Sequence, residues 1–302
     1  MEFLPEKELL YHQERDYLRS GINILQRKGI KFPSGWECLV QGNIPINAGS
    51  ASSSALVVAW IKFLLEAAKD LRTQIPEEIA ELSFSAEVAE FKEPGGKMDH
   101  YTSSLGGIVS IHFGEKMKVT KLKSPLKKFV LADSLQKKDT TGMLGYIKGH
   151  ALRGLASVRK KIKSFSLKSP LSPEVRREIE KLPPREKRLL RGTLLTRDLT
   201  AEGKTLFESD NFDHKRFGEL LSLQHSVLRD NLRISTPKIE QMIQSSLQAG
   251  AFGAKINGSG GGGCMFAYAP ENAEKVAKAL RKLGTKVYIV HVDEGVRIET
   301  QN

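Results

Sequence analysis

The sequence predicts an α+β protein of two domains, and two patterns lead to this class. Apolar residues recur at helical spacing over long segments, whereas shorter segments alternate apolar and polar residues as strands do. The strands give way to a mostly helical stretch near residues 140–150. Because each half then has its own helices and strands to form a layered core, we expect domains at 1–145 and 146–302.

The first half begins with an amphipathic segment, residues 5–28, whose apolar residues are three and four apart and which ends near Gly29. A second helix follows a loop of small residues, and a third begins after Pro76 and ends before a Pro-Gly-Gly turn. The expected helices are 5–28, 56–69 and 77–91, and the expected strands are 36–40, 108–113, 118–122 and 129–132.

The second half is predicted to be helical over most of residues 140–248. Strand patterns return at 251–256, 264–269 and 287–292, around a helix expected at 271–283. This last group has the order of a βαβ unit, which favours a sheet covered by helices.

Length and composition exclude several classes of protein. The chain has 302 residues, of which 40% are hydrophobic and 27% charged, as expected for a globular protein. No run of eighteen apolar residues is present, so no membrane span is expected, and the first residues do not resemble a secretory signal. Two cysteines, Cys38 and Cys264, are too few for a disulfide framework and indicate a reducing cytoplasm.

The chain is basic: 47 lysines and arginines against 35 acidic residues give a net charge of +12. This balance favours anionic partners such as nucleotides or phosphorylated metabolites. Nucleic acid is disfavoured as a partner, because no aromatic residues lie between the basic ones to stack with bases.

Residues 45–55, PINAGSASSSA, form the first candidate site. Small residues let a backbone approach a ligand closely, and the N-terminus of the helix that follows attracts phosphate. The serines Ser52–Ser54 add hydroxyls for phosphate or Mg²⁺. A plain helix cap is the alternative, because serine is a common N-cap residue.

Residues 253–264, GAKINGSGGGGC, form the second candidate site between two expected strands. So many glycines lose conformational entropy on folding, and a plain turn needs only one or two. We therefore expect a backbone surface that closes over phosphates or substrate, with a bulged connection as the alternative.

Residues 87–100, EVAEFKEPGGKMDH, bring carboxylates from a helix and from the turn after it. Glu87 or Glu90 suits a metal ligand, and Asp99 suits a general base; a helix-capping role for Asp99 is the alternative. The seven histidines are scattered, which disfavours zinc, and Walker A, Rossmann and G-x-S-x-G motifs are absent.

In this order and spacing, the three segments resemble the GHMP small-molecule kinases, a family that includes galactokinase, homoserine kinase and mevalonate kinase. Pro45–Ala55 is similar to the family motif P-x-x-x-G-L-G-S-S-A, and Gly253–Cys264 to G-A-K-x-T-G-x-G-x-G-G-C, with Asn257 at the threonine position. Residues 95–107 resemble the C-G-x-M-D-Q stretch of galactokinases and, more closely, the G-G-K-Q-D-Q-Y of heptose and fucose kinases. Residues 217–235 resemble the galactokinase helix before the last motif, so the resemblance covers about residues 15–295.

The resemblance implies a ribosomal S5 domain 2-like N-terminal half and a ferredoxin-like C-terminal half, with ATP and Mg²⁺ as cofactors. It implies that Asp99 is the catalytic base and that Ser52 and Glu87 hold the metal, with Glu90 as the alternative to Glu87. ATP phosphates would be bound by Ala48, Gly49, Ser50, Ala51, Ser52 and Ser53. The wall beside substrate and phosphate would be formed by Gly258, Ser259, Gly260, Gly261 and Gly262.

The activity that the resemblance implies is phosphorylation of a sugar hydroxyl, of the galactokinase type and at the anomeric position. Heptose, fucose or mevalonate kinase activity, or a silent relative that only binds nucleotide and sugar, are the alternatives. The glycine three residues before Asp99 matches the sugar kinases, which ranks them above mevalonate kinase.

One family feature is missing from the sequence. The first motif of galactokinases, G-R-x-N-x-x-G-E-H-x-D-Y, should precede the helix expected from residue 5, and no such segment is found. We therefore expect an N-terminal sheet with too few strands, whose exposed edge a homo-oligomer would cover. We also expect weak activity or none without an upstream segment, with Lys97 as the one cation near Asp99.

Overall fold

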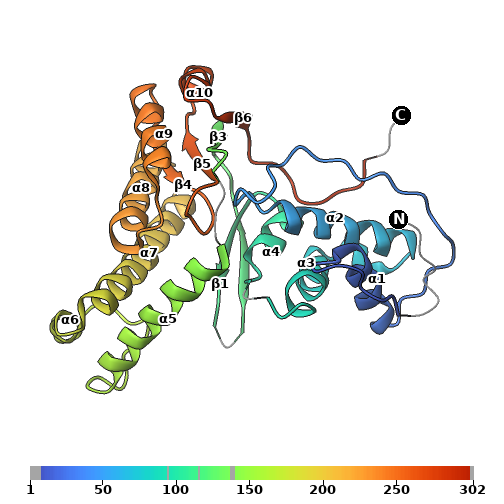
Figure 1. Cartoon of the computed structure of the whole chain (residues 1–302), viewed down its shortest axis with the longest axis horizontal. Helices are drawn as coiled ribbons and strands as arrows, with labels where there is room; N and C mark the ends of the chain where they lie inside the picture. Colours follow the sequence, from blue (N-terminus) through green and yellow to red (C-terminus); the bar gives the residue numbers. More distant parts are fainter. Residues whose placement is uncertain (1–7, 94, 115, 137–139, 300–302) are drawn as a thin grey trace. The chain divides into compact units, whose positions relative to one another are not determined.

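A computed structural model describes residues 8–93, 95–114, 116–136 and 140–299 (Figure 1). The chain divides into two compact units, of which the second contains residues 47–50 and 125–291. The first contains the described residues up to 46, residues 51–124 and those from 292 onwards. The division follows the strand that begins at Phe129, which pairs only with strands of the second unit. Folding domains at 1–145 and 146–302 remain a prediction.

The first unit is mostly helical and has one two-stranded antiparallel sheet, in which Ser110 of β1 lies opposite Thr120 of β2. Its elements are α1 (Tyr17–Arg27), α2 (Ser52–Ala67), the 3-10 turn η1 (Leu71–Gln74), α3 (Pro76–Phe84), the π-helical turn η2 (Ser85–Ala89), α4 (Met98–Leu105), β1 (Ile108–His112) and β2 (Lys118–Leu122). The helices after the small-residue loop and after Pro76 are thus confirmed, as are the two strands.

The core of the first unit lies between α1, α2 and α3. Leu25, Ile61, Leu65 and Ile79 come from these three helices and are fully or almost fully buried. The C-terminal segment returns to this unit, where the amide of Gly107 donates to the carbonyl of Asp293 over 2.8 Å. Burial of one apolar face by each helix is what the helical spacing in the sequence predicted.

Two predicted elements differ in the structure. The helix expected over 5–28 begins only at Tyr17, and residues 5–7 lie outside the described residues. Before it the chain folds back on α1: the side-chain amide of Asn23 both donates to and accepts from the backbone of Leu9 over 2.8 Å. The strand expected at Trp36–Val40 is wrong, because residues 36–40 form no strand and their side chains are exposed. A strand needs a neighbour to bond its backbone, and none pairs with this segment among the described residues.

The second unit combines a four-stranded sheet with a long helical region. Its elements are β3 (Phe129–Asp133), α5 (Thr140–Arg159), α6 (Pro173–Glu180), α7 (Pro184–Glu208), α8 (His214–Val227), the π-helical turn η3 (Leu228–Leu232), α9 (Pro237–Gln248), β4 (Gly253–Ile256), β5 (Cys264–Tyr268), α10 (Ala273–Arg281) and β6 (Lys286–Val290). The expected helical stretch and the expected strands and helix after it are confirmed.

The strands of this sheet run in the order β4-β5-β3-β6 and every neighbouring pair is antiparallel. Val130 at the centre of β3 lies opposite Ala267 of β5 and Ile289 of β6. Helices α9 and α10 cover the sheet through Ile239 and Val276, which are fully buried. The sheet therefore provides a rigid frame for the connection between β4 and β5, which is the glycine-rich segment.

A membrane-crossing helix is absent from the described part of the chain, since none of its helices has the necessary length and apolar character. Cys38 and Cys264 form no disulfide bond: Cys38 is exposed and Cys264 is buried in β5. The cytoplasmic location inferred from them stays a prediction.

Candidate active site

The small-residue loop ends in a tight turn that leads directly into α2. Asn47, Gly49 and Ala51 have φ angles of 56°, 83° and 54°, so the backbone turns sharply at alternate residues. Ala51 is the residue that precedes α2, and it provides no side-chain cap. The alternative of a plain serine cap is therefore not what the structure contains. The amides of the first turn have no carbonyl partner within a helix, which makes this end of α2 suited to an anion.

The serines of the first turn lie next to a buried carboxylate. Glu87 is 6% exposed and sits in the π-helical turn η2 that continues α3. Such turns often occur at functional sites, because the extra residue changes the direction of a side chain. Its Oε2 lies 2.7 Å from Nε2 of His100, and the hydroxyls of Ser53 and Ser54 also bond to it. The structure thus brings together two of the expected site residues, Ser53 and Glu87.

The environment of Glu87 keeps its carboxyl group ionised. Burial alone raises the pKa of this carboxyl, but hydrogen bonds from His100, Ser53 and Ser54 outweigh burial, and the pKa lies below its ordinary value of 4.5. Since an ionised carboxylate only accepts, Nε2 of His100 carries the hydrogen. The other ring nitrogen, Nδ1, is buried and has no hydrogen-bond partner among the described residues.

Asp99 lies in the first turn of α4, immediately before His100, and is half-buried. An acidic residue is favourable there, because the N-terminal end of a helix carries partial positive charge. The residue that precedes α4 is Lys97, and no side chain caps the helix there, so Asp99 does not occupy the capping position.

Glu90 and Lys97, the two other charged candidates of this segment, have partners of their own. Glu90 accepts from Arg27 at 2.7 Å and from the Tyr11 hydroxyl at 2.5 Å. Lys97 donates to both oxygens of Glu81, at 2.8 and 2.7 Å. These contacts favour Glu87 over Glu90 as a metal ligand and give no support to Lys97 as a cation for Asp99.

The glycine-rich loop between β4 and β5 uses the conformations that only glycine adopts readily. Five of its glycines have positive φ angles of 66°, 81°, 76°, 127° and 71°, at Gly258 and Gly260–Gly263. At Gly263 a side chain is also excluded by contact, because an added Cβ atom would lie 2.5 Å from the carbonyl oxygen of Ala48. A bulged connection without a ligand was the alternative for this segment, and it does not explain why Gly263 lies against Ala48 of the distant small-residue loop.

The two loops contact each other within the second unit. The amide of Cys264 donates to the carbonyl of Ala48 over 2.8 Å. The side-chain amide of Asn257 donates to the carbonyl of Gly49 over 3.0 Å. Ala48 and Gly49 of the first candidate segment are therefore bonded directly to Asn257 and Cys264, which flank the run of glycines in the second.

Sequence reasoning missed two residues of this arrangement. In the sequence, His100 is only one of seven scattered histidines, although it follows directly after Asp99. Asn257 is distinctive in the sequence only for its place in a motif, which does not predict its bond to the small-residue loop. A histidine or amide next to an expected site residue was the available signal in both cases.

Two family models match the chain. The model for the N-terminal domain of GHMP kinases matches residues 16–107, and that for their C-terminal domain matches residues 206–286. Together these ranges make up more than half of the sequence and contain Glu87, Asp99 and the glycine-rich loop.

The chain belongs to the GHMP kinase family.

Relatives of this GHMP kinase include enzymes with different acceptors. It is 29% identical over 293 residues to the mevalonate kinase of Thermococcus sibiricus, covering 94% of this chain and 74% of that protein. It is 25% identical over 302 residues to the galactokinase of Thermococcus kodakarensis, covering 94% of this chain and 81% of that protein. Between these two, the identity is higher to the mevalonate kinase, so identity does not support ranking sugar kinases first.

Solved structures share the two-domain GHMP kinase fold with this chain. Galactokinase from Lactococcus lactis, complexed with galactose, matches with a TM-score of 0.75 and 19% identity over 96% of this chain and 78% of its own. A mevalonate kinase matches with a TM-score of 0.61 and 21% identity over 91% of this chain and 75% of its own. The fold class expected from the sequence is confirmed.

The residues around Glu87 fit a magnesium ion by the chemistry of their donor atoms. Mg²⁺ binds oxygen and usually takes one or two protein carboxylates, with water and substrate phosphates completing its shell. Glu87 provides one ionised carboxylate and the serines provide hydroxyl oxygens. Among the described residues, no three or more His, Cys, Asp or Glu side chains are grouped so that they could hold a metal ion by themselves.

Proposed function

We propose that this chain is an ATP-dependent kinase that phosphorylates a hydroxyl group of a sugar, of the galactokinase type and at the anomeric position. The observation that carries the proposal is the ionised Glu87 carboxylate, bonded to hydroxyls of the first turn of α2. It joins a phosphate-binding helix end to a metal-binding side chain, which phosphoryl transfer requires. Asp99, in a nearby segment of the sequence, adds a carboxylate suited to a base.

The roles follow from the chemistry of the residues. Backbone amides of Ala48–Ser53 bind the triphosphate, and Ser52 and Glu87 would hold the metal, which would supply positive charge to neutralise the phosphates. Asp99 accepts the proton of the acceptor hydroxyl as its oxygen forms a bond to the γ-phosphorus. The bond from that phosphorus to the β–γ bridging oxygen breaks, and ADP leaves. Gly258–Gly262 exclude water with a surface of backbone.

Mevalonate is the second candidate acceptor, because the identity to the mevalonate kinase exceeds that to the galactokinase. Both acceptors present an alcohol, so the same base and phosphate site serve either reaction. A silent relative that binds nucleotide without turnover is the third candidate, and the presence of Ser52 and Asp99 favours the enzyme over it.

ADP release tests the proposal directly. The purified chain is incubated with Mg·ATP and galactose, fucose, a heptose or mevalonate, each in a separate assay. We expect release with one of the sugars; release only with mevalonate transfers the proposal to the second acceptor. If a fluorescent ATP analogue binds and no acceptor stimulates ADP release, the kinase proposal is wrong and the silent relative is favoured.

Association of copies of the chain is also proposed. The segment without helix or strand exposes several large apolar side chains within residues 36–46, among them Leu39 at 83% and Ile46 at 80%, and grouped apolar side chains of this kind are typical of association surfaces. Light scattering of the purified protein tests this, and a monomer at all concentrations contradicts it.

A further inference from the structure

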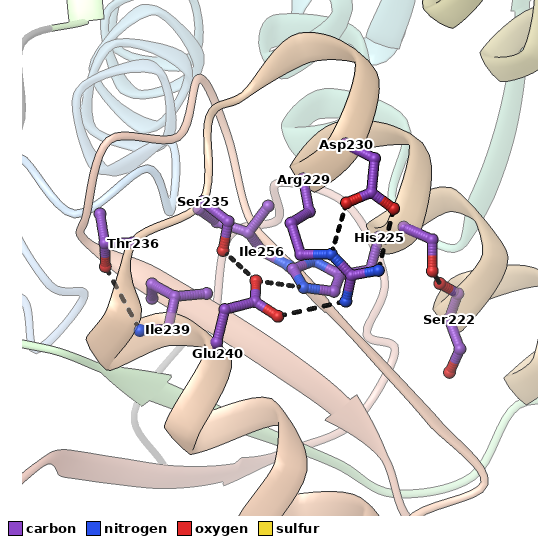
Figure 2. Close-up of polar contacts among 10 residues, drawn as sticks. Ser222, His225, Arg229, Asp230, Ser235, Thr236, Ile239, Glu240 and Ile256 are labelled. Carbon is purple, nitrogen blue, oxygen red and sulfur yellow. Dashed lines mark hydrogen bonds and ion pairs between the residues drawn. The ribbon is translucent and has the colours of Figure 1, made fainter.

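A network of polar side chains lies next to the residues that support the glycine-rich loop, and it is separate from Glu87 and Asp99. We call its members, His225, Arg229, Ser235 and Glu240, the His225 network; Figure 2 shows them around the Glu240 carboxylate. Nε2 of His225 lies 2.9 Å from Oε1 of Glu240, and Nη1 of Arg229 donates to Oε2 over 3.4 Å. The Ser235 hydroxyl donates to Oε1 as well. The network joins α8, the turn η3 and α9.

His225 is 3% exposed, and each of its ring nitrogens has a partner. Nδ1 accepts from the backbone amide of Ile256 over 3.4 Å, and Nε2 faces Glu240. Burial lowers the pKa of His225 against the opposing effect of Glu240, so the ring is neutral near pH 7. These partners assign the hydrogen to Nε2, because Nδ1 must accept.

The network ends at two backbone positions that carry the glycine-rich loop. Ile256 is the last residue of β4, and the loop begins directly after it. Ile234 precedes Ser235, and its carbonyl accepts from the amide of Gly261 over 2.7 Å. Gly260 is pressed against the same residue, because an added Cβ atom would lie 2.4 Å from the Cβ of Ile234. The start and the middle of the loop therefore both rest on residues that the network holds.

A buried histidine bonded to a carboxylate costs more free energy at this position in the second unit than an apolar side chain would. His225 is buried, whereas the Glu240 side chain is 33% exposed, so the cost of removing polar groups from water falls mainly on the histidine, and an apolar side chain in its place would not have that cost. Polar groups hold their partners in defined directions, which apolar contacts do not. The bonds thus restrict the directions of the two backbone positions.

We propose that His225, Glu240 and Ser235 are positioning residues of the kinase, which hold Ile256 and Ile234 so that the glycine-rich loop keeps the shape that binds nucleotide. The proposal rests on the proposed function for its kinetic consequence. The expected effect on the loop is independent of the proposed function, because the shape of the loop is a property of the protein without ligand.

Hydrogen–deuterium exchange of the unliganded full chain tests the effect on the loop. His225→Ala removes the side-chain partner of the Ile256 amide and one of the three partners of Glu240, and we expect the amides of residues 257–264 to exchange at least about fivefold faster. His225→Asn can still accept from Ile256, and His225→Gln can still donate to Glu240, so each should restore part of the protection. His214→Gln is the control, because His214 bonds to Tyr268 instead and should leave loop exchange within about twofold of the parent.

Kinetics of the same variants test the consequence for the reaction. We expect KM for ATP to rise at least about fivefold in His225→Ala and Ser235→Ala, while KM for the acceptor stays within about twofold. Parent-like loop exchange in a folded His225→Ala protein, or an equal increase over the whole four-stranded sheet, overturns the proposal. If the parent shows no kinase activity, the proposed function fails, while the exchange experiment still decides whether the network holds the loop.

Discussion

Nε2 of His100 lies 2.7 Å from Oε2 of Glu87, and the two side chains are 1% and 7% exposed. The bond joins the first turn of α4 to the π-helical turn η2, so the residue next to Asp99 is held by the carboxylate expected to bind metal. The proposed metal ligand, Glu87, and the residue that follows the proposed base, Asp99, are therefore connected by one buried hydrogen bond.

Replacement of Asp99 by Asn should lower kcat at least about 100-fold and leave ATP binding intact, because a positioned base contributes this much. The measurement is ADP release at saturating ATP with the acceptor identified in the panel, alongside binding of a fluorescent ATP analogue. Asp198→Asn is the matched control, since Asp198 is exposed and pairs with Arg197. A kcat above about one tenth of the parent value would remove Asp99 from the role of base.

Replacement of Ser52 by Ala should raise KM for ATP about tenfold, because a hydrogen bond to a charged group is lost from the first turn of α2. KM for the acceptor should not change. Stability should change by no more than about 0.5 kcal/mol, since Ala51 and not Ser52 precedes the helix. Ser209→Ala serves as the control at an exposed helix end. Unchanged KM for ATP together with unchanged kcat excludes Ser52 from the site.

The Glu87 carboxylate should make stability depend on pH in the acidic range. Its pKa in the folded protein lies below the ordinary 4.5, so the unfolded chain binds more protons when the pH falls through that value. The stabilisation is present above about pH 5 and is lost progressively as the pH decreases further. Thermal unfolding from pH 6 to pH 3 measures this, and Glu87→Gln should show a shallower decrease of Tm than the parent. Parallel curves for the two proteins would contradict it.

Replacement of Gly263 by Ala should destabilise the second unit more than the same change at Gly284. Both glycines have φ near +70°, so alanine at either position is destabilised by roughly 1–2 kcal/mol because of its left-handed backbone conformation. Only at Gly263 does the new Cβ atom meet a backbone carbonyl, that of Ala48 at 2.5 Å; nothing lies within 4 Å at Gly284. The difference between the two Tm values isolates this contact. We expect Gly263→Ala to have the lower Tm and to bind ATP more weakly; equal Tm values would show that the loops separate without cost.

The sequence by itself determined most of the helices and strands and the segments that contain the candidate site. Helical spacing in residues 56–69 predicts which side of α2 is buried, and alternation in residues 129–132 predicts the buried side of β3, which carries Val130 and Ala132. This information is local. The many glycines in residues 258–263 likewise predict backbone conformations that other residues rarely adopt. The structure has positive φ angles at all five of these glycines. Resemblance of three short segments was enough to indicate the kinase family.

Only the tertiary structure decided which residues meet. Trp36–Val40 has a strand-like pattern and forms no strand, because a strand depends on a neighbour that the pattern does not specify. His100 became the partner of Glu87, and Ile234 the support of Gly261, through contacts between residues far enough apart that no local spacing encodes them. Hydrogen bonds of this kind require both groups to be brought within about 3 Å by the packing of whole helices and sheets, which a pattern along one segment cannot describe.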